Sequence, residues 1–313
     1  MKYPIGIQTF EQIINNGFVY VDKTDMVYAL ATEGKTYFLS RPRRFGKSLL
    51  LSTLRAYFEG KKELFKGLKI DKLEKDWHAH RVLHIDFNGV VFTRPGALED
   101  ELDKQLSTWE EEYHLPKGTR EMYGWRFEQI VQAIYTETGR GAVVLIDEYD
   151  KPLLDVLEMD PELLNNNREI LKAFYSVFKR TDAYLRFVFL TGVTKFSQVS
   201  VFSGFNQPLD ISMTEKFEAL CGITEEELHT QFAEPIREMA QAENCTEEEM
   251  KLQLKKHYDG YHFSKQMADI YNPFSILNAF YNKDIRDFWF ATGTPTYLIR
   301  LMNHFNEGID ELT

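Results

Sequence analysis

Gly46, Lys47 and Ser48 have the residue types and the spacing that bind the phosphates of a nucleotide. Backbone N–H groups at the start of a helix point at phosphate oxygens, and the helix dipole favours the anion. In such a loop a glycine allows close approach of the backbone, a lysine reaches the β- and γ-phosphates, and a serine hydroxyl holds Mg²⁺. We therefore predict ATP and Mg²⁺ as cofactors, with ATP bound by Arg43, Arg44, Phe45, Gly46, Lys47, Ser48 and Leu49.

The entry of this loop departs from the usual pattern GxxxxGK[ST], because the first glycine of that pattern falls on Arg41. Arg43 and Arg44 follow in the same loop. The three arginines either surround the triphosphate with positive charge or present one guanidinium to a neighbouring subunit. The alternative is that each pairs with an acidic group elsewhere on the surface.

Two acids, Asp147 and Glu148, end the apolar run Ala142 to Ile146 (AVVLI). We predict that Asp147 holds Mg²⁺ together with Ser48, and that Glu148 is the general base for an attacking water. The alternative is that both acids cap the helix that follows. Their position after an apolar run, downstream of the phosphate loop, favours the metal site.

A polar strand end supplies a second predicted catalytic residue. The apolar run Phe187 to Leu190 (FVFL) closes on Thr191, whose hydroxyl we predict to touch the γ-phosphate or the attacking water. Equally, Thr191 caps a loop. Asp150, one turn after Asp147, is expected to be an outer or a structural carboxylate. The predicted catalytic residues are thus Glu148 and Thr191.

Strands and helices that alternate along the chain must position these residues. Short apolar runs that end at the loop and at the acids are typical of strands buried on both faces of a parallel sheet. Amphipathic helices between such strands predict βαβ units and an α/β fold. The expected strands are Tyr37–Leu39, Val82–Phe87, Ala142–Ile146 and Phe187–Leu190. One expected helix begins at Lys47, and three others cover Leu98–Tyr113, Trp125–Thr138 and Asn167–Arg180.

The pattern changes after about Thr214, where helix signals dominate. We therefore divide the chain into a phosphate-loop domain, residues 1–213, and a mainly helical region, residues 214–313. Asp259-Gly260 is a turn signal and leaves room for a small hairpin. The helix starts in this region are marked by the capping-box pairs Thr224 with Glu227 and Thr246 with Glu249, and by Asn272-Pro273.

Composition excludes several classes of protein. The chain has 313 residues, of which 43% are hydrophobic and 27% charged, so a disordered chain is not expected. A net charge of −11 disfavours non-specific DNA binding. The two cysteines form no CxxC pair, no apolar leader follows Met1, and no long apolar run exists. We expect a cytoplasmic protein with reduced thiols and no membrane contact.

Two further groups of residues are expected to be structural. His78, His80 and His84 lie in HAHRVLH, but no cysteine or carboxylate pair with metal-ligand spacing lies nearby. The aromatic residues of Tyr258–Phe263 (YDGYHF) are expected to pack together, with stacking on bases as the alternative.

Together, several segments resemble the bacterial AAA-ATPase-like family. They are Tyr20–Thr24 (YVDKT), Arg41–Ser48 (RPRRFGKS), Leu145–Asp150 (LIDEYD), Thr191–Phe196 (TGVTKF) and Tyr258–Tyr261 (YDGY). The resemblance covers nearly the whole chain, and RPRRFGKS is the usual loop of that family, so Arg41 is a family trait. It implies a P-loop NTPase core of the additional-strand type, followed by a helical region with a winged helix as one option.

The resemblance also implies features outside the loop. In related ATPases a segment such as Tyr3–Ile7 (YPIGI), with Phe10, packs on the adenine; packing in the core is the alternative. Many members carry a C-terminal PD-(D/E)XK nuclease-like domain, for which residues 214–313 leave no room. We expect this chain to lack it.

Two functional hypotheses follow. The first is slow, Mg²⁺-dependent hydrolysis of ATP that drives a conformational change. The second is a nucleotide-gated binding module with negligible turnover, which the arginine at the loop entry favours and the pair Asp147-Glu148 disfavours. A small-molecule kinase comes third, because no acid or arginine clamp for its substrate is apparent. Beyond ATP and ADP, the sequence identifies no protein or nucleic-acid partner, and a homo-oligomer stays open.

Overall fold

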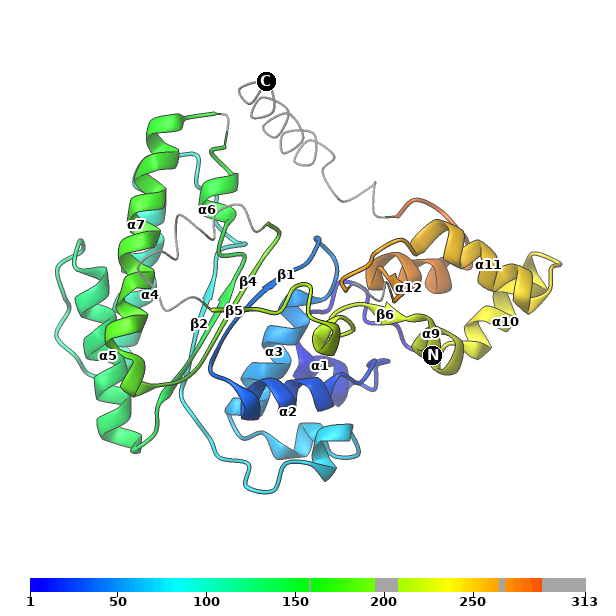
Figure 1. The fold of residues 1–313 in the computed structure, drawn as a ribbon, viewed down its shortest axis with the longest axis horizontal. Coiled ribbons are helices and arrows are strands. Elements are labelled where there is room, and N and C mark those ends of the chain that lie inside the picture. The colour runs from blue at the N-terminus through cyan, green and yellow to red at the C-terminus, as the bar shows by residue number, and fades with distance from the viewer. Residues whose placement is uncertain (158, 195–207, 265–267, 289–313) are drawn as a thin grey trace.

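The centre of the protein is a five-stranded, entirely parallel sheet with the order β2-β3-β4-β1-β5. The computed structural model describes residues 1–157, 159–194, 208–264 and 268–288 (Figure 1). The strands of this sheet are β1 (Thr36–Ser40), β2 (Val82–Asp86), β3 (Ala142–Asp147), β4 (Leu185–Gly192) and β5 (Leu209–Asp210).

The strand order places β4 between β1, which leads into the phosphate loop, and β3, which ends in the acids. Phe38 of β1 pairs with Leu190 of β4, and Leu190 pairs in turn with Ile146 of β3. One strand therefore separates the loop from the acids, and this strand order confirms the predicted P-loop NTPase fold of the additional-strand type.

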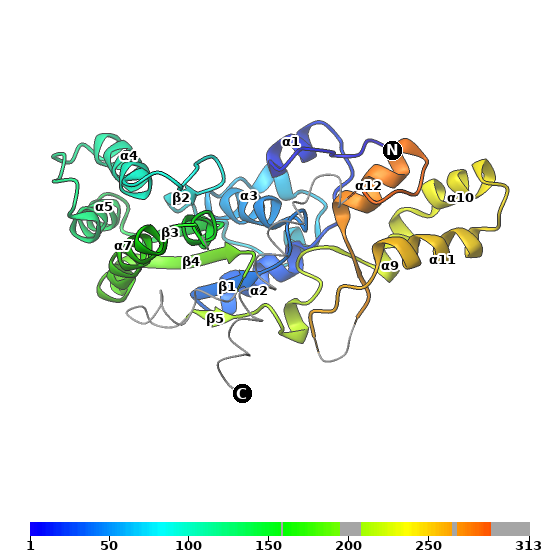
Figure 2. The same cartoon turned by 90° about the horizontal axis from the view of Figure 1, so that it is seen from above.

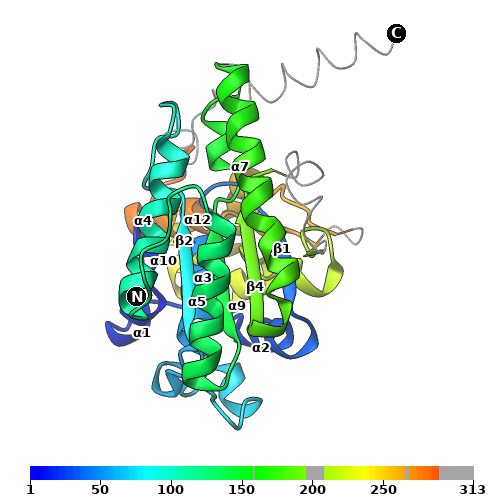
Figure 3. The ribbon, with the colours of Figure 1, turned by 90° about the vertical axis from the view of Figure 1, so that its left-hand side faces the viewer.

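Helices cover both faces of the sheet (Figures 2 and 3). Val144 and Ile146 face one hydrophobic cluster, which contains residues of α4, α5 and α7, whereas Val143 and Leu145 face the other, which contains residues of α2 and α3. Successive side chains of a strand point to opposite faces, so a strand with both faces covered is apolar throughout. This explains why AVVLI shows no alternation.

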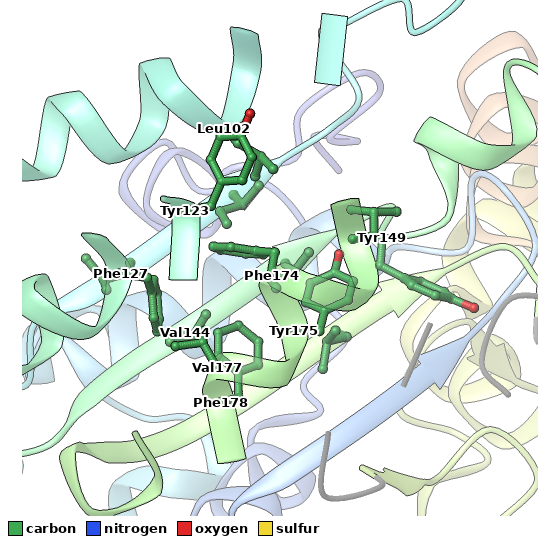
Figure 4. Close-up of a cluster of buried hydrophobic side chains, with 14 of the residues drawn as sticks. Leu102, Tyr123, Phe127, Val144, Tyr149, Phe174, Tyr175, Val177 and Phe178 are labelled. Carbon is green, nitrogen blue, oxygen red and sulfur yellow. The ribbon is translucent and has the colours of Figure 1, made fainter. Parts of the chain in front are cut away.

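The first of these clusters is rich in aromatic rings. Phe127 on α5 packs against Phe174 and Phe178 on α7, with ring centroids 5.6 and 5.2 Å apart. Figure 4 shows these rings together with Tyr149, which follows the acids at the end of β3 and is fully buried. The acidic turn is thus anchored in the core.

The predicted helices of the sheet domain are present. One of them begins earlier than expected, at Pro161 instead of Asn167, because the side chain of Asp160 accepts a hydrogen bond from Leu163 N and caps the helix. The described helices of residues 1–213 are α1 (Phe10–Asn15), α2 (Thr24–Glu33), α3 (Lys47–Phe58), α4 (Ala97–Glu112), α5 (Tyr123–Thr138), α6 (Lys151–Leu154) and α7 (Pro161–Arg180). Short 3₁₀ turns lie at Lys62–Phe65, Lys69–Lys72 and Asp182–Tyr184, and another follows this part at Glu215–Phe217.

The described residues after 214 are mainly helical, as predicted, and have their own hydrophobic cluster. Both predicted capping boxes form, and the side chain of Asn272 caps the helix that begins at Pro273. A small antiparallel pair joins β6 to β7, and Tyr261 bridges to Ile270. The winged-helix option and the boundary at residue 213 stay predictions. The elements are β6 (Ile223–Thr224), α9 (Glu225–Gln231), α10 (Ala233–Ala242), α11 (Glu247–Tyr258), β7 (Ile270–Tyr271) and α12 (Pro273–Asn282).

A buried ion pair joins the two parts of the chain. The ammonium group of Lys23, just before α2, lies 2.5 Å from Glu227 Oε1 on α9. Lys23 is buried, and Glu227 also accepts the backbone N–H of Thr224 in its capping box.

Among the described residues, no helix is both long and apolar enough to cross a membrane.

Candidate functional site

The phosphate loop joins β1 to α3 at the carboxyl end of the sheet. The strand ends at Ser40 and the helix begins at Lys47. Gly46 has a φ of 93°, in the left-handed region where a side chain is strained. A Cβ built on Gly46 would meet no atom within 4 Å, so the space beside it is open. The unpaired N–H groups at the start of α3 therefore lie beside a space that an anion can enter.

Lys47 and Ser48 contact the two acids that end β3. Lys47 Nζ lies 3.1 Å from Glu148 Oε1 and donates to the carbonyl oxygen of Arg41 at 2.9 Å. The Ser48 hydroxyl donates to Asp147 Oδ2 over 2.6 Å. The residues predicted to bind phosphate, metal and water thus meet, because parallel strands end at the same edge of the sheet.

Thr191 ends β4 and joins this group. Its hydroxyl donates to Asp147 Oδ1 over 2.6 Å and accepts the backbone N–H of Glu148 at 3.4 Å. Glu148 has a φ of 53°, a conformation that costs a non-glycine residue about 1–3 kcal/mol and persists where its surroundings impose it. The structure therefore brings both predicted catalytic residues to the predicted metal position.

A cavity of about 540 Å³ lies in front of the loop. The N-terminal residues 4–8 form a second wall, and α12 forms a third. Asp147 lines an adjoining cavity of about 380 Å³, which shares Ser48 with the first. Of the predicted site residues, those that line the larger cavity are Arg43, Arg44, Gly46, Lys47, Ser48, Leu49 and Glu148.

A third, smaller cavity of about 100 Å³ continues from the first beneath the N-terminal segment. Pro4, Leu49 and Leu277 line both cavities, so the two are contiguous. The walls of the smaller one are mostly apolar, with Lys23 as an exception. A flat apolar ring fits such walls better than a charged group does.

Arg41 does not line the large cavity. It is only 1% exposed, and its guanidinium donates to the carbonyl oxygens of Ser212 at 2.7 Å and Ser40 at 2.9 Å, and lies 3.9 Å from the centre of the Phe263 ring. Burial lowers the pKa of Arg41 to about 10, so the side chain stays charged at neutral pH. The Arg41 side chain therefore has neither of two roles considered from the sequence: it does not face the large cavity, and its partners named above are carbonyl oxygens and an aromatic ring, not surface acids.

Phe45 has a structural role for its side chain. The ring is buried against Tyr261 and Phe263, with centroid distances of 4.6 and 5.4 Å. Phe45, which we predict to bind the cofactor, does not line the large cavity but does line the smaller one, so this contact stays a prediction. Tyr261 and Phe263 of YDGYHF pack together on Phe45, whereas Tyr258 lies in the hydrophobic cluster of the C-terminal region.

Several lining residues carry signals that the sequence analysis did not use. Asp86 ends the apolar strand β2 as Asp147 ends β3, and the two pair in register. Asn88 lies two residues further, and Lys151 follows the acidic turn; both line the large cavity. Lys151 Nζ is held 2.6 Å from Asp155 Oδ2. The lining residues of α12, such as Asn278, could not be placed from local patterns.

The structural role of the histidines stays a prediction, and His84 lines the adjoining cavity together with Asp147. His80 Nδ1 lies 3.0 Å from the carbonyl oxygen of Gly141. Burial lowers the pKa of His84, which lies on β2. Within the described ranges, no group of three or more His, Cys, Asp or Glu side chains has the arrangement of a metal site.

Comparison with known proteins gives two results. A family model described as "Predicted AAA-ATPase" matches residues 4–202. The chain is also similar to a protein of Azotobacter chroococcum mcd 1 described as "Uncharacterized protein in vnfD 5'region", with 41% identity over 303 residues. That match covers 96% of this chain and 56% of the relative, so the chain spans about half the length of that relative.

Proposed function

Because this chain belongs to the AAA-ATPase-like family, we propose that it binds ATP with Mg²⁺ in the large cavity and hydrolyses it slowly. One observation carries the proposal: Lys47, Ser48, Asp147, Glu148 and Thr191 come from three separate segments and are joined by contacts of 2.6 to 3.4 Å. A surface turn with a chance Gly-Lys-Ser sequence has no reason to meet two acids and a threonine in this way.

The donor set fits a hard divalent cation. The Ser48 hydroxyl and the Asp147 carboxylate lie 2.6 Å apart and supply only oxygen, the ligand type that Mg²⁺ prefers. Bound between these groups and the nucleotide, Mg²⁺ would neutralise charge on the β- and γ-phosphates. Thr191 orients the carboxylate from its other side and so fixes which oxygen is presented.

Lys47 is the phosphate contact that this account requires. In the structure its ammonium group is bound to Glu148 and to carbonyl oxygens of the loop. The phosphates would replace these partners, and Glu148 would then be free to accept a proton from water. When Lys47 exchanges Glu148 for the phosphates, nucleotide binding thus releases the Glu148 carboxylate from its ion pair.

The smaller apolar cavity is the proposed position of the adenine ring. It adjoins the large cavity at Leu49, just past the phosphate loop, and Pro4 and Leu277 bring the N-terminal segment and α12 to it. A nucleotide placed across both cavities contacts both parts of the chain. Closure of α12 on the ring is the conformational change that we propose.

A nucleotide-gated module with negligible turnover is the second candidate. The ion pair between Lys47 and Glu148 favours the switch, because in the absence of phosphates the proposed base is occupied by the loop lysine. The aromatic packing of Phe45 on Tyr261 also gives the loop a direct mechanical link to the C-terminal region. Both features serve a switch as well as they serve an enzyme.

The two candidates are separated by measuring binding and turnover on the same sample. Thermal unfolding with ATP, ADP and GTP, with and without Mg²⁺, should show stabilisation by ATP that increases with Mg²⁺. Phosphate release should then be slow but faster than that of Glu148→Gln. Stabilisation with no release above the Glu148→Gln rate would favour the switch, and no stabilisation by any nucleotide would refute both.

A further inference from the structure

The acidic turn after β3 is hydrogen-bonded along its length to the end of β4. Asp147 and Glu148 both contact the Thr191 hydroxyl, as described above. Tyr149 N donates to the carbonyl oxygen of Thr191 at 2.8 Å, and the Tyr149 hydroxyl donates to the carbonyl oxygen of Thr194 at 3.1 Å. The proposed catalytic base therefore sits in a turn whose shape depends on residues 191–194.

Asp150 provides the last contact between these segments. Its Oδ2 accepts hydrogen bonds from Thr194 N and Thr194 Oγ1, each at 2.8 Å, and from Val193 N at 3.1 Å. The residue has no exposed surface. Three donors on one carboxylate, two of them backbone amides, hold the turn at its far end much as Thr191 holds it at its near end.

The packing around Gly192 shows how close the two segments are. A Cβ at Gly192 would lie 2.5 Å from the Tyr149 ring and 2.9 Å from Asp150 Oδ1. Such distances are not tolerated between atoms, so only glycine permits this approach. The arrangement leaves the turn little freedom to relax, which is what the left-handed conformation of Glu148 requires.

An ionised carboxylate is an expensive choice for this buried position. Burial, and then the negative charge of Glu148, raise the pKa of Asp150 to about 7. An asparagine would avoid that cost but would offer one acceptor oxygen instead of two, whereas Val193 N contacts both carboxylate oxygens, at 3.1 and 3.4 Å. A perturbed acid beside a proposed base is more often found where geometry serves chemistry.

We propose that Asp150 is a positioning residue that holds the backbone of Glu148, through residues 193 and 194, in the conformation that directs its carboxylate at the attacking water. The proposal rests on the hydrolysis proposed above. Asp150 itself touches neither the nucleotide nor the water, since it does not line the large cavity.

Two substitutions test this role in the full chain. Asp150→Asn keeps the shape but replaces one acceptor oxygen by a donor that faces N–H groups. Thr194→Val removes only the hydroxyl contact. Both should leave the dissociation constant for ATP within about twofold, while phosphate release falls about tenfold or more for Asp150→Asn and less for Thr194→Val, as small misplacements of a catalytic group do. Thr181→Val is the control, because the Thr181 hydroxyl is also buried but bonds to Val177 on α7.

A double-mutant cycle distinguishes positioning from general damage. If Asp150 acts through Glu148, Asp150→Asn should have no further effect on phosphate release in a Glu148→Gln background. An equal fall in both backgrounds, a fall in ATP affinity that matches the fall in rate, or unchanged release in Asp150→Asn would overturn the role of Asp150. Wild-type release no faster than that of Glu148→Gln would instead overturn hydrolysis, and Asp150's role with it.

Discussion

Replacing Arg41 by glycine, the residue that the usual phosphate loop has at this position, should destabilise the protein. The guanidinium is buried and donates to Ser212 and Ser40 at 2.7 and 2.9 Å, with longer contacts to the carbonyl oxygens of Phe217 and Glu218 at 3.3 Å. Each buried carbonyl that loses its donor costs about 1–3 kcal/mol. Counting the two short hydrogen bonds and allowing for relaxation, we expect the unfolding free energy of Arg41→Gly to fall by about 3 kcal/mol.

Thermal or urea unfolding of the nucleotide-free protein measures this loss. At roughly 2–4 °C per kcal/mol for a domain of about 150–250 residues, such as the phosphate-loop domain, the Tm of Arg41→Gly should fall by about 6–12 °C. Arg43→Gly is the matched control, because Arg43 is exposed in the same loop and the added freedom of a glycine is common to both variants. Equal Tm values for the two variants would refute the structural role that we assign to Arg41.

Three further predictions concern catalysis, the pH dependence of stability, and DNA binding. Glu148→Gln should keep ATP affinity but slow phosphate release by about 10² to 10⁴, whereas Asp147→Asn should weaken Mg²⁺-dependent ATP binding itself; equal effects on binding in a titration would contradict these roles. In the folded state the pKa of Asp150 is about 7, above the value of about 3.9 for an unfolded chain. At pH values between these two, the folded state therefore binds more protons than the unfolded state does. The unfolding free energy should therefore fall from pH 5 to pH 8 more steeply in wild type than in Asp150→Asn, and parallel urea-unfolding profiles would exclude this. The chain, with a net charge of −11, should bind duplex DNA weakly at physiological salt and should not cut it; a tight, salt-sensitive gel shift would show otherwise.

Much of the sheet domain could be predicted because its signals are local. A strand buried on both faces, such as AVVLI, is apolar throughout, and parallel strands bring their carboxyl ends to one edge. These two rules place Asp147, Thr191 and the loop residues together without any knowledge of distances. The capping boxes of α9 and α11 were equally accessible, because each depends on two residues in one turn.

The features that were missed depend on contacts between distant segments. Nothing near Arg41 in the sequence indicates that its guanidinium binds Ser212 and stacks on Phe263. The same holds for Phe45, whose ring packs against Tyr261 from a distant part of the chain. Asp86 could have been found, since it ends an apolar strand just as Asp147 does.

Binding of ATP to wild type and to Lys47→Ala tests the central claim most directly. Lys35→Ala serves as the control. Lys35 pairs with Asp182 and lies just before β1, at the opposite end of the strand from the phosphate loop. With Mg²⁺ and ATP at about a hundred times its dissociation constant, the unfolding free energy of wild type and of Lys35→Ala should rise by roughly 2.7 kcal/mol. Lys47→Ala should show no such increase. An ATP-induced increase in Lys47→Ala equal to that of wild type would contradict the assignment of this loop as the nucleotide site.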